Sequence, residues 1–144
     1  MIALLEDPER GGSPSVEAAI LAVVFGLLIA FAIAGGRLVA AEAAADHAAR
    51  AAARAASLQR DPAAATAFAR TTADASLAEQ GLRCAQLDVD LDTSQFSAPP
   101  GTPASVTASV RCAVDWAELG LPASGGPVIE SVAASPLDRW RERT

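Results

Sequence analysis

The stretch VEAAILAVVFGLLIAFAIAGG, residues 16–36, contains a single ionisable side chain, that of Glu17. As an α-helix rising about 1.5 Å per residue, a run of this length extends about 31 Å, enough to cross the hydrocarbon core of a bilayer. A carboxylate at the start of such a helix is costly unless a positive charge lies nearby. The sequence therefore predicts a membrane-spanning helix, with Glu17 as a candidate contact residue at its beginning.

The residues before this run, MIALLEDPERGGSPS, are acidic, with Glu6, Asp7 and Glu9 against Arg10. A cleaved secretory signal would instead have a basic beginning, a shorter apolar segment and an A-x-A-like cleavage site. We therefore interpret the apolar run as a retained anchor.

The residues after the run, 37–58, are mostly alanine, the best helix former, and no proline interrupts residues 15–60. The helix is thus predicted to continue to about residue 60. One side carries charges every four residues, at Glu42, Asp46, Arg50 and Arg54. Asp46 and Arg50 have the spacing of a helical ion pair. The other side is nearly all alanine, which suits close packing against a neighbouring helix, packing on the chain's own domain, or a plain stalk. The pattern leaves these alternatives open.

The remaining residues, 61–144, are predicted to form a small α+β domain. Asp61 and Pro62 have the residue types that begin a helix, and Gly81 is a suitable stop. The face expected to be buried consists of Ala65, Phe68, Ala69, Thr72, Ser76 and Leu77. Alternating apolar residues then predict strands at 83–91, 104–116 and 128–134, which form an antiparallel sheet. Phe96 is the one large apolar residue in the loop between the first two strands.

The chain has two cysteines, Cys84 and Cys112, both beyond the apolar run. Two cysteines in one small domain beyond a membrane helix predict a disulfide in an oxidising compartment, and hence an extracytoplasmic domain. In the chain-entropy model, closing a loop of about 28 residues stabilises the domain by roughly 3–4 kcal/mol.

Charge counting gives a different orientation. Arg10 stands alone before the apolar run, whereas Arg37, Arg50 and Arg54 follow it, and this bias favours an N-terminus outside the cytoplasm. The cysteine pair favours an N-terminus inside, and we give the cysteines more weight because they concern chemistry in a defined compartment.

Nothing in the sequence predicts catalysis, a cofactor or a metal. The only histidine, His47, lies in the alanine-rich helix, where a surface position is expected, and no second ligand stands at metal-binding spacing. Asp88, Asp90 and Asp92 alternate along one predicted strand, as on a solvated face. The two adjacent glycines, Gly125 and Gly126, indicate a turn rather than a phosphate-binding loop. Without a basic cluster, and with a formal net charge of −6, the chain is not expected to bind nucleic acid.

The order of these features resembles a known family. Residues 10–17 read RGGSPSVE, so that Glu17 is the fifth residue after Gly12, and the apolar run and the alanine-rich segment follow. This layout resembles the TadE-like minor pilins, or pseudopilins, of tight-adherence (Flp-type) pilus systems. The cysteine in each of two strands and the ending VAASPLDRWRER resemble actinobacterial members.

The resemblance implies a structural subunit rather than an enzyme. It implies a leader at 1–12, cleavage between Gly12 and Ser13 by a prepilin-type peptidase, a helix at 13–60 and an extracytoplasmic domain at 61–144. Glu17 would be an assembly contact, balanced by the new amine of Ser13 or by a partner. The partners would be membrane lipid, other pilins and the pilus assembly machinery. The alternative is a single-pass membrane-anchored module that binds an extracellular ligand without a filament.

Overall fold

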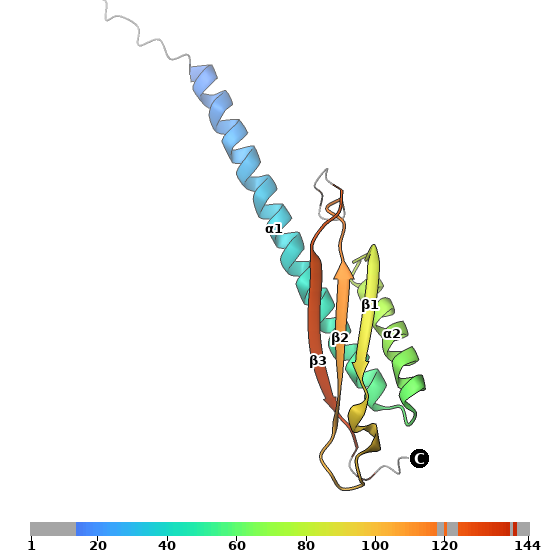
Figure 1. The fold of residues 1–144 in the computed structure, drawn as a ribbon. Helices are drawn as coiled ribbons and strands as arrows, with labels where there is room; N and C mark the ends of the chain where they lie inside the picture. The colour runs from blue at the N-terminus through green and yellow to red at the C-terminus, as the bar shows by residue number, and fades with distance from the viewer. Residues whose placement is uncertain (1–13, 118–119, 121–123, 139, 141–144) are drawn as a thin grey trace, which may run out of the picture. The chain divides into compact units, whose positions relative to one another are not determined.

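The computed structural model describes residues 14–117, 120, 124–138 and 140. Helix α1 spans Pro14–Ser57, helix α2 spans Pro62–Glu79, and strands β1 (Gln86–Asp92), β2 (Ser105–Ala113) and β3 (Val128–Pro136) follow, with a short 3-10 turn η1 at Ser94–Ser97. The strands form one antiparallel sheet in the order β1-β2-β3 (Figure 1). The predicted α+β fold, with a long apolar helix, a second helix and three strands, is confirmed.

The chain divides into two compact units, residues 1–33 and residues 34–144. Residues 14–33 of helix α1 belong to the first unit, and residues 34–57 of the same helix belong to the second. Its 44 residues contain proline only at the first position, and it ends where the Ser57 hydroxyl donates a hydrogen bond of 2.8 Å to the Arg54 carbonyl. The helix boundaries therefore follow from alanine content and from the absence of internal proline.

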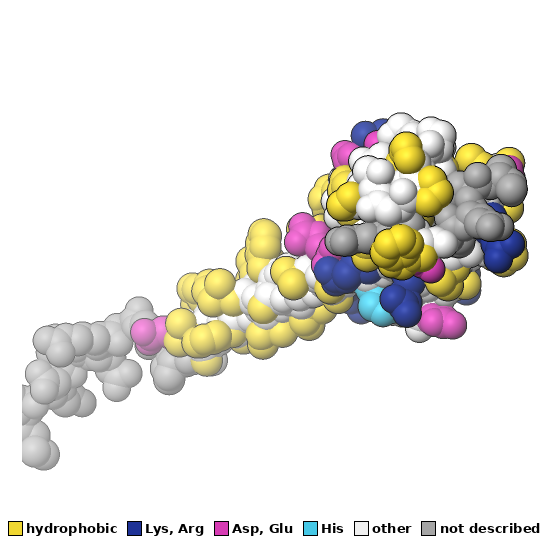
Figure 2. Space-filling model, turned by 90° about the horizontal axis from the view of Figure 1, so that it is seen from below, with side chains coloured by type: hydrophobic (Ala, Val, Ile, Leu, Met, Phe, Trp, Pro, Cys, Tyr) yellow, Lys and Arg dark blue, Asp and Glu magenta, His cyan; other side chains and the backbone are white. Residues whose placement is uncertain are grey.

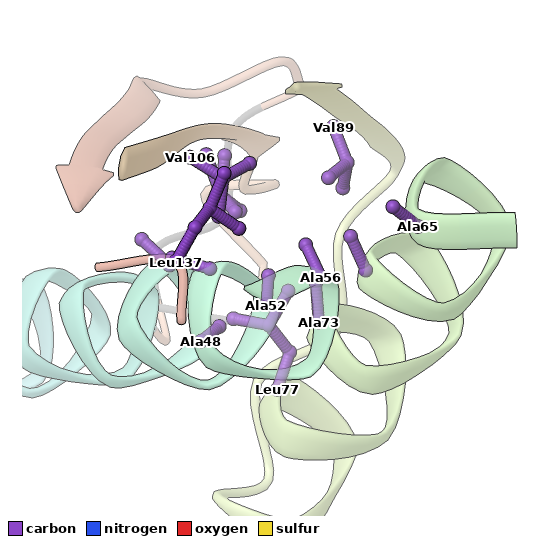
Figure 3. Packing of buried hydrophobic residues seen from close by; sticks show 14 of the residues in the cluster. Ala48, Ala52, Ala56, Ala65, Ala73, Leu77, Val89, Val106 and Leu137 are labelled. Carbon is purple, nitrogen blue, oxygen red and sulfur yellow. The ribbon is translucent and has the colours of Figure 1, made fainter. Parts of the chain in front are cut away.

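In the second unit, the alanine side of α1 packs on the chain's own sheet. Eight alanines have exposed fractions between 0 and 4%: Ala41, Ala44, Ala45, Ala48, Ala49, Ala52, Ala53 and Ala56. Figure 3 shows Ala48, Ala52 and Ala56 among the residues of this core. The small side chains of α1 lie in buried clusters together with residues of α2 and of the strands. Of the alternatives that the sequence left open, packing on its own domain is what the structure shows.

Helix α2 begins as expected. The Asp61 carboxylate accepts a hydrogen bond of 2.8 Å from the Ala64 amide, and Pro62 follows at the first helical position. Beyond its end, Gly81 has a φ of +73°, a backbone conformation that suits glycine. The side facing the core consists of Ala65, Ala69, Ala73, Ser76 and Leu77.

Phe68 corrects the prediction for α2, because its side chain is 54% exposed rather than buried. The buried residues follow i, i+4 spacing from Ala65. A residue at i+3 from Ala65 is rotated to the side of that line, and Phe68 occupies this position.

The sheet has one buried and one open face. Val89, Val106, Ala108 and Val110 point toward the helices, and Figure 3 shows Val89 and Val106 over the alanines. Phe96, from the loop between the first two strands, is 6% exposed and enters the same core. Gly126 lets the β2–β3 connection close, because an added Cβ would lie 1.7 Å from the Val114 carbonyl oxygen.

The strand bounds differ from the predictions by a few residues at their ends. β1 begins at Gln86 rather than at residue 83, since Cys84 leaves the sheet to form its disulfide. β2 ends at Ala113 rather than at residue 116, although Val114 and Trp116 still donate to the carbonyls of Pro127 and Gly125. β3 extends two residues further, to Pro136.

Candidate functional site

The first unit carries an apolar surface that nothing in that unit covers. Between residues 16 and 33, the large apolar side chains are 46–76% exposed: Val16, Ile20, Leu21, Val23, Val24, Phe25, Leu27, Leu28, Ile29, Phe31 and Ile33. They occur at successive positions around the helix, so no side of this segment is polar. Figure 2 shows apolar side chains along the visible face of this helical segment. Water is a poor environment for such a surface, which calls for lipid or other apolar helices.

Among the described residues, α1 is the one helix long and apolar enough to cross a membrane. Its most apolar 18-residue window has a mean hydropathy of 2.7 and is 0% buried within the protein. This result agrees with the predicted anchor and makes α1 a candidate membrane span.

Glu17 lies in the first turn of α1 and is the acidic residue of that turn. The unpaired amides of a first turn carry partial positive charge, which favours a carboxylate there. Gly12 and Ser13, the predicted processing site, lie outside the described residues. The structure therefore places Glu17 at the start of the apolar surface, and the predicted cleavage stays a prediction.

Cys84 and Cys112 form a disulfide, as the sequence predicted, with their Cα atoms 5.2 Å apart. Cys112 is fully buried in β2 and faces Leu87 across the sheet, whereas Cys84 precedes β1. Ala41, Ala45, Val114 and Ile129 pack around Cys112 in one cluster. The bond therefore links the segment after α2 to the strand that contacts the early turns of α1 in this unit.

Several polar contacts across the domain were not predicted. The Ser131 hydroxyl donates a hydrogen bond of 3.1 Å to the Asp46 carboxylate, and the Ser135 hydroxyl lies 3.1 Å from that of Ser57. These bonds join β3 to α1. The serines at inward-facing positions of β3 indicate that their half-buried hydroxyls have partners, but not which residues those partners are.

The predicted Asp46–Arg50 ion pair is present on α1. A second ion pair, unpredicted, joins Arg111 of β2 to Glu130 of β3 at 3.0 Å on the open face. The hydrogen bond and the positive charge of Arg111 lower the pKa of Glu130, and Glu130 in turn raises the pKa of Arg111.

The acidic residues of β1 and His47 do not come together in one site. Asp88, Asp90 and Asp92 are exposed along β1, and within the described ranges no three His, Cys, Asp or Glu side chains are placed to hold a metal ion. His47 is exposed on α1, as expected, and its Nδ1 lies 3.0 Å from the Ser76 hydroxyl of α2. This contact joins the two helices.

The chain combines an exposed apolar N-terminal helix, which is a candidate membrane anchor, with an α+β domain that contains a disulfide. Residues 12–54 match the family model described as TadE-like protein. This N-terminal part of the chain is therefore similar to the TadE-like family, which is associated with Tad pilus systems. The matched residues cover the predicted processing site, Glu17, the apolar run and most of the alanine-rich segment. Neither the curated proteins nor the solved structures that were compared gave a match.

Proposed function

We propose that this protein is a minor pilin or pseudopilin that assembles or anchors a tight-adherence pilus at the cell membrane. The observation that supports this role is the exposed apolar surface of residues 16–33, with Glu17 in the first turn. Lipid alone would cover such a surface. Partner helices that carry similar apolar segments would also cover it, and would offer a positive charge to Glu17. The proposed role is structural, without catalysis.

The proposed contact surface is the apolar segment rather than the alanine face. The eight buried alanines of α1, from Ala41 to Ala56, pack against the chain's own sheet and are 0–4% exposed. A partner helix could reach them only by displacing that sheet. Contacts between subunits in a filament would therefore involve residues 16–33.

Processing and topology are part of the proposal. A prepilin-type peptidase would cut between Gly12 and Ser13 at the cytoplasmic face, which places the domain at 34–144 outside. The disulfide supports this orientation, because disulfides persist in oxidising compartments. Sequencing the N-terminus of the membrane-derived protein should give Ser13 as the first residue. An intact Met1 or Ile2 would contradict the cleavage.

Site-specific photo-cross-linking in cells tests the assembly role. A photoreactive residue at Val23, which is 64% exposed, should yield adducts with other pilins of the same system. The control position is Thr66, which is exposed on α2 in the second unit. If Val23 yields adducts with lipid but with no pilin, the filament role is wrong and the membrane-anchored binding module is favoured.

A further inference from the structure

β3 is one of the two edge strands of the sheet. Among the described residues β3 pairs with β2 alone, and the bonds Val114 N–H to Pro127 O and Leu137 N–H to Ala104 O fix which residues face β2. Pro127 and Leu137, which flank β3, therefore turn their backbone groups toward β2, and so do the odd-numbered residues between them. In an antiparallel ladder the alternate residues point their N–H and C=O groups away. The open edge therefore presents the backbone groups of Val128, Glu130, Val132 and Ala134.

A groove of about 600 Å³ opens beside this edge, between β3 and α1 within the second unit. Its α1 side carries Leu38, Val39 and Ala43, and Val39 is 64% exposed. Its β3 side runs along residues 127–131. Five strand residues extend about 17 Å, so the groove has the length of a short extended segment.

The charges of the groove are acidic. Glu42, Asp46 and Glu130 line it. Asp46 pairs with Arg50 and Glu130 with Arg111, whereas Glu42 has no ion pair within the part of the chain that the structure describes. The groove therefore retains a negative charge, which favours a cationic occupant.

The directions of α1 and β3 argue against symmetric pairing of the β3 edge with the same edge of a second copy. Asp46 bonds to Ser131 and Ser57 to Ser135, so the helix and the strand run in the same direction. Symmetric pairing of β3 with itself requires antiparallel strands. Residue 34, through which the apolar segment is attached, would then lie at opposite ends of the pair. Two copies anchored in one membrane cannot meet that condition.

We propose that the edge of β3 binds an extended segment of a partner protein, in which apolar residues alternate with arginine or lysine. The backbone of the segment would continue the sheet through Val128, Glu130 and Val132. Its inward side chains would contact Leu38, Val39 and Ala43, and its outward cationic side chain would lie beside Glu130. Strand addition of this kind draws affinity from main-chain bonds and specificity from alternate side chains. This binding site at the β3 edge shares no residue with the apolar segment of residues 16–33, so binding there does not require the proposed filament role.

A labelled synthetic peptide of about nine residues, in which valine alternates with arginine and threonine, tests this site by fluorescence anisotropy with the full chain in detergent micelles. The wild-type chain should bind it saturably. Val132→Pro removes one outward N–H without breaking a bond to β2, and should weaken binding at least about tenfold. Val132→Thr keeps that N–H and the branched shape, and should bind within about twofold of the wild type.

Charge reversal provides a second variant that does not alter the backbone. Glu130→Arg should weaken binding of the arginine peptide and strengthen binding of a matched peptide with glutamate in place of arginine. Circular dichroism confirms that each variant is folded. Equal binding by Val132→Pro and the wild type would overturn the proposal, as would the absence of saturable binding. A disulfide cross-link between β3 strands of two copies, through cysteines introduced at Val132, would assign the edge to self-association instead.

Discussion

Glu17 combines a position that favours its charge with a neighbourhood that does not. The first turn of α1 supplies unpaired amides, whereas the side chains that follow are apolar and exposed. The helix end alone could hold the carboxylate near the headgroups, so that Glu17 would have no role in assembly. The alternative is a positive charge on a partner or on the amine of a processed Ser13.

Glu17→Gln separates the two interpretations. If the carboxylate is an assembly contact, the variant should still be inserted and processed, but less partner pilin should co-purify with it and fewer pili should form. The measurement is co-purification from membranes, with Glu79→Gln as the control because Glu79 is an exposed carboxylate on α2. Wild-type co-purification and piliation in Glu17→Gln would mean that the carboxylate has no part in assembly.

The Arg111–Glu130 pair should give the domain a small pH dependence. Arg111 lowers the pKa of Glu130 below its ordinary value of about 4.5. A carboxyl group with a lowered pKa stabilises the folded state above its unfolded pKa, and this contribution is lost as the pH falls through the folded pKa. The denaturation midpoints of the wild type and Glu130→Gln should therefore differ more at about pH 7 than at about pH 3. An equal difference at both pH values would show that the pair contributes nothing.

At the scale of the element, α1 is one helix with two environments. Its apolar residues up to Ile33 are exposed on all sides, whereas eight of its alanines between Ala41 and Ala56 are buried in the domain core. Alanine suits the second environment because any larger side chain would separate the helix from the sheet.

Ala52→Leu tests this packing. The Ala52 side chain is 0% exposed, so the added atoms should overpack the core and lower the free energy of unfolding by about 1–3 kcal/mol. Ala43→Leu, at an exposed position of the same helix, should leave it nearly unchanged. Chemical denaturation followed by circular dichroism measures both variants. Equal effects at the two positions would contradict the close contact between helix and sheet.

Some elements were predictable because their signals are local. Proline and alanine fixed the length of α1, Asp61 and Gly81 marked the ends of α2, and the strands alternate clearly. The sequence could not decide where the alanine face packs, because alanine suits a partner helix and the chain's own sheet equally well. The Asp46–Ser131 bond joins residues separated by 85 positions, and no local pattern predicts such a pairing.

At the scale of the whole molecule, the disulfide is the constraint that can be removed cleanly. Replacing both cysteines by serine should lower the free energy of unfolding by roughly 3–4 kcal/mol, since the unfolded chain loses a closed loop. Thiol labelling of the protein from its native compartment should find no alkylated cysteine before reduction. Two readily alkylated thiols would mean that Cys84 and Cys112 are not bonded in the cell.

Because the apolar segment and the buried alanines belong to one helix, a pulling force on the apolar segment would reach the domain core through the helix backbone. Tension enters through the backbone that carries the buried alanines, with no intervening linker to absorb it. A mechanically stretched domain would still keep the segment between Cys84 and Cys112 closed, because a covalent bond resists forces that separate packed strands. The 28-residue separation then withholds up to about 95 Å of contour length at roughly 3.4 Å per residue. An overloaded domain would lengthen by a limited amount before its disulfide had to break.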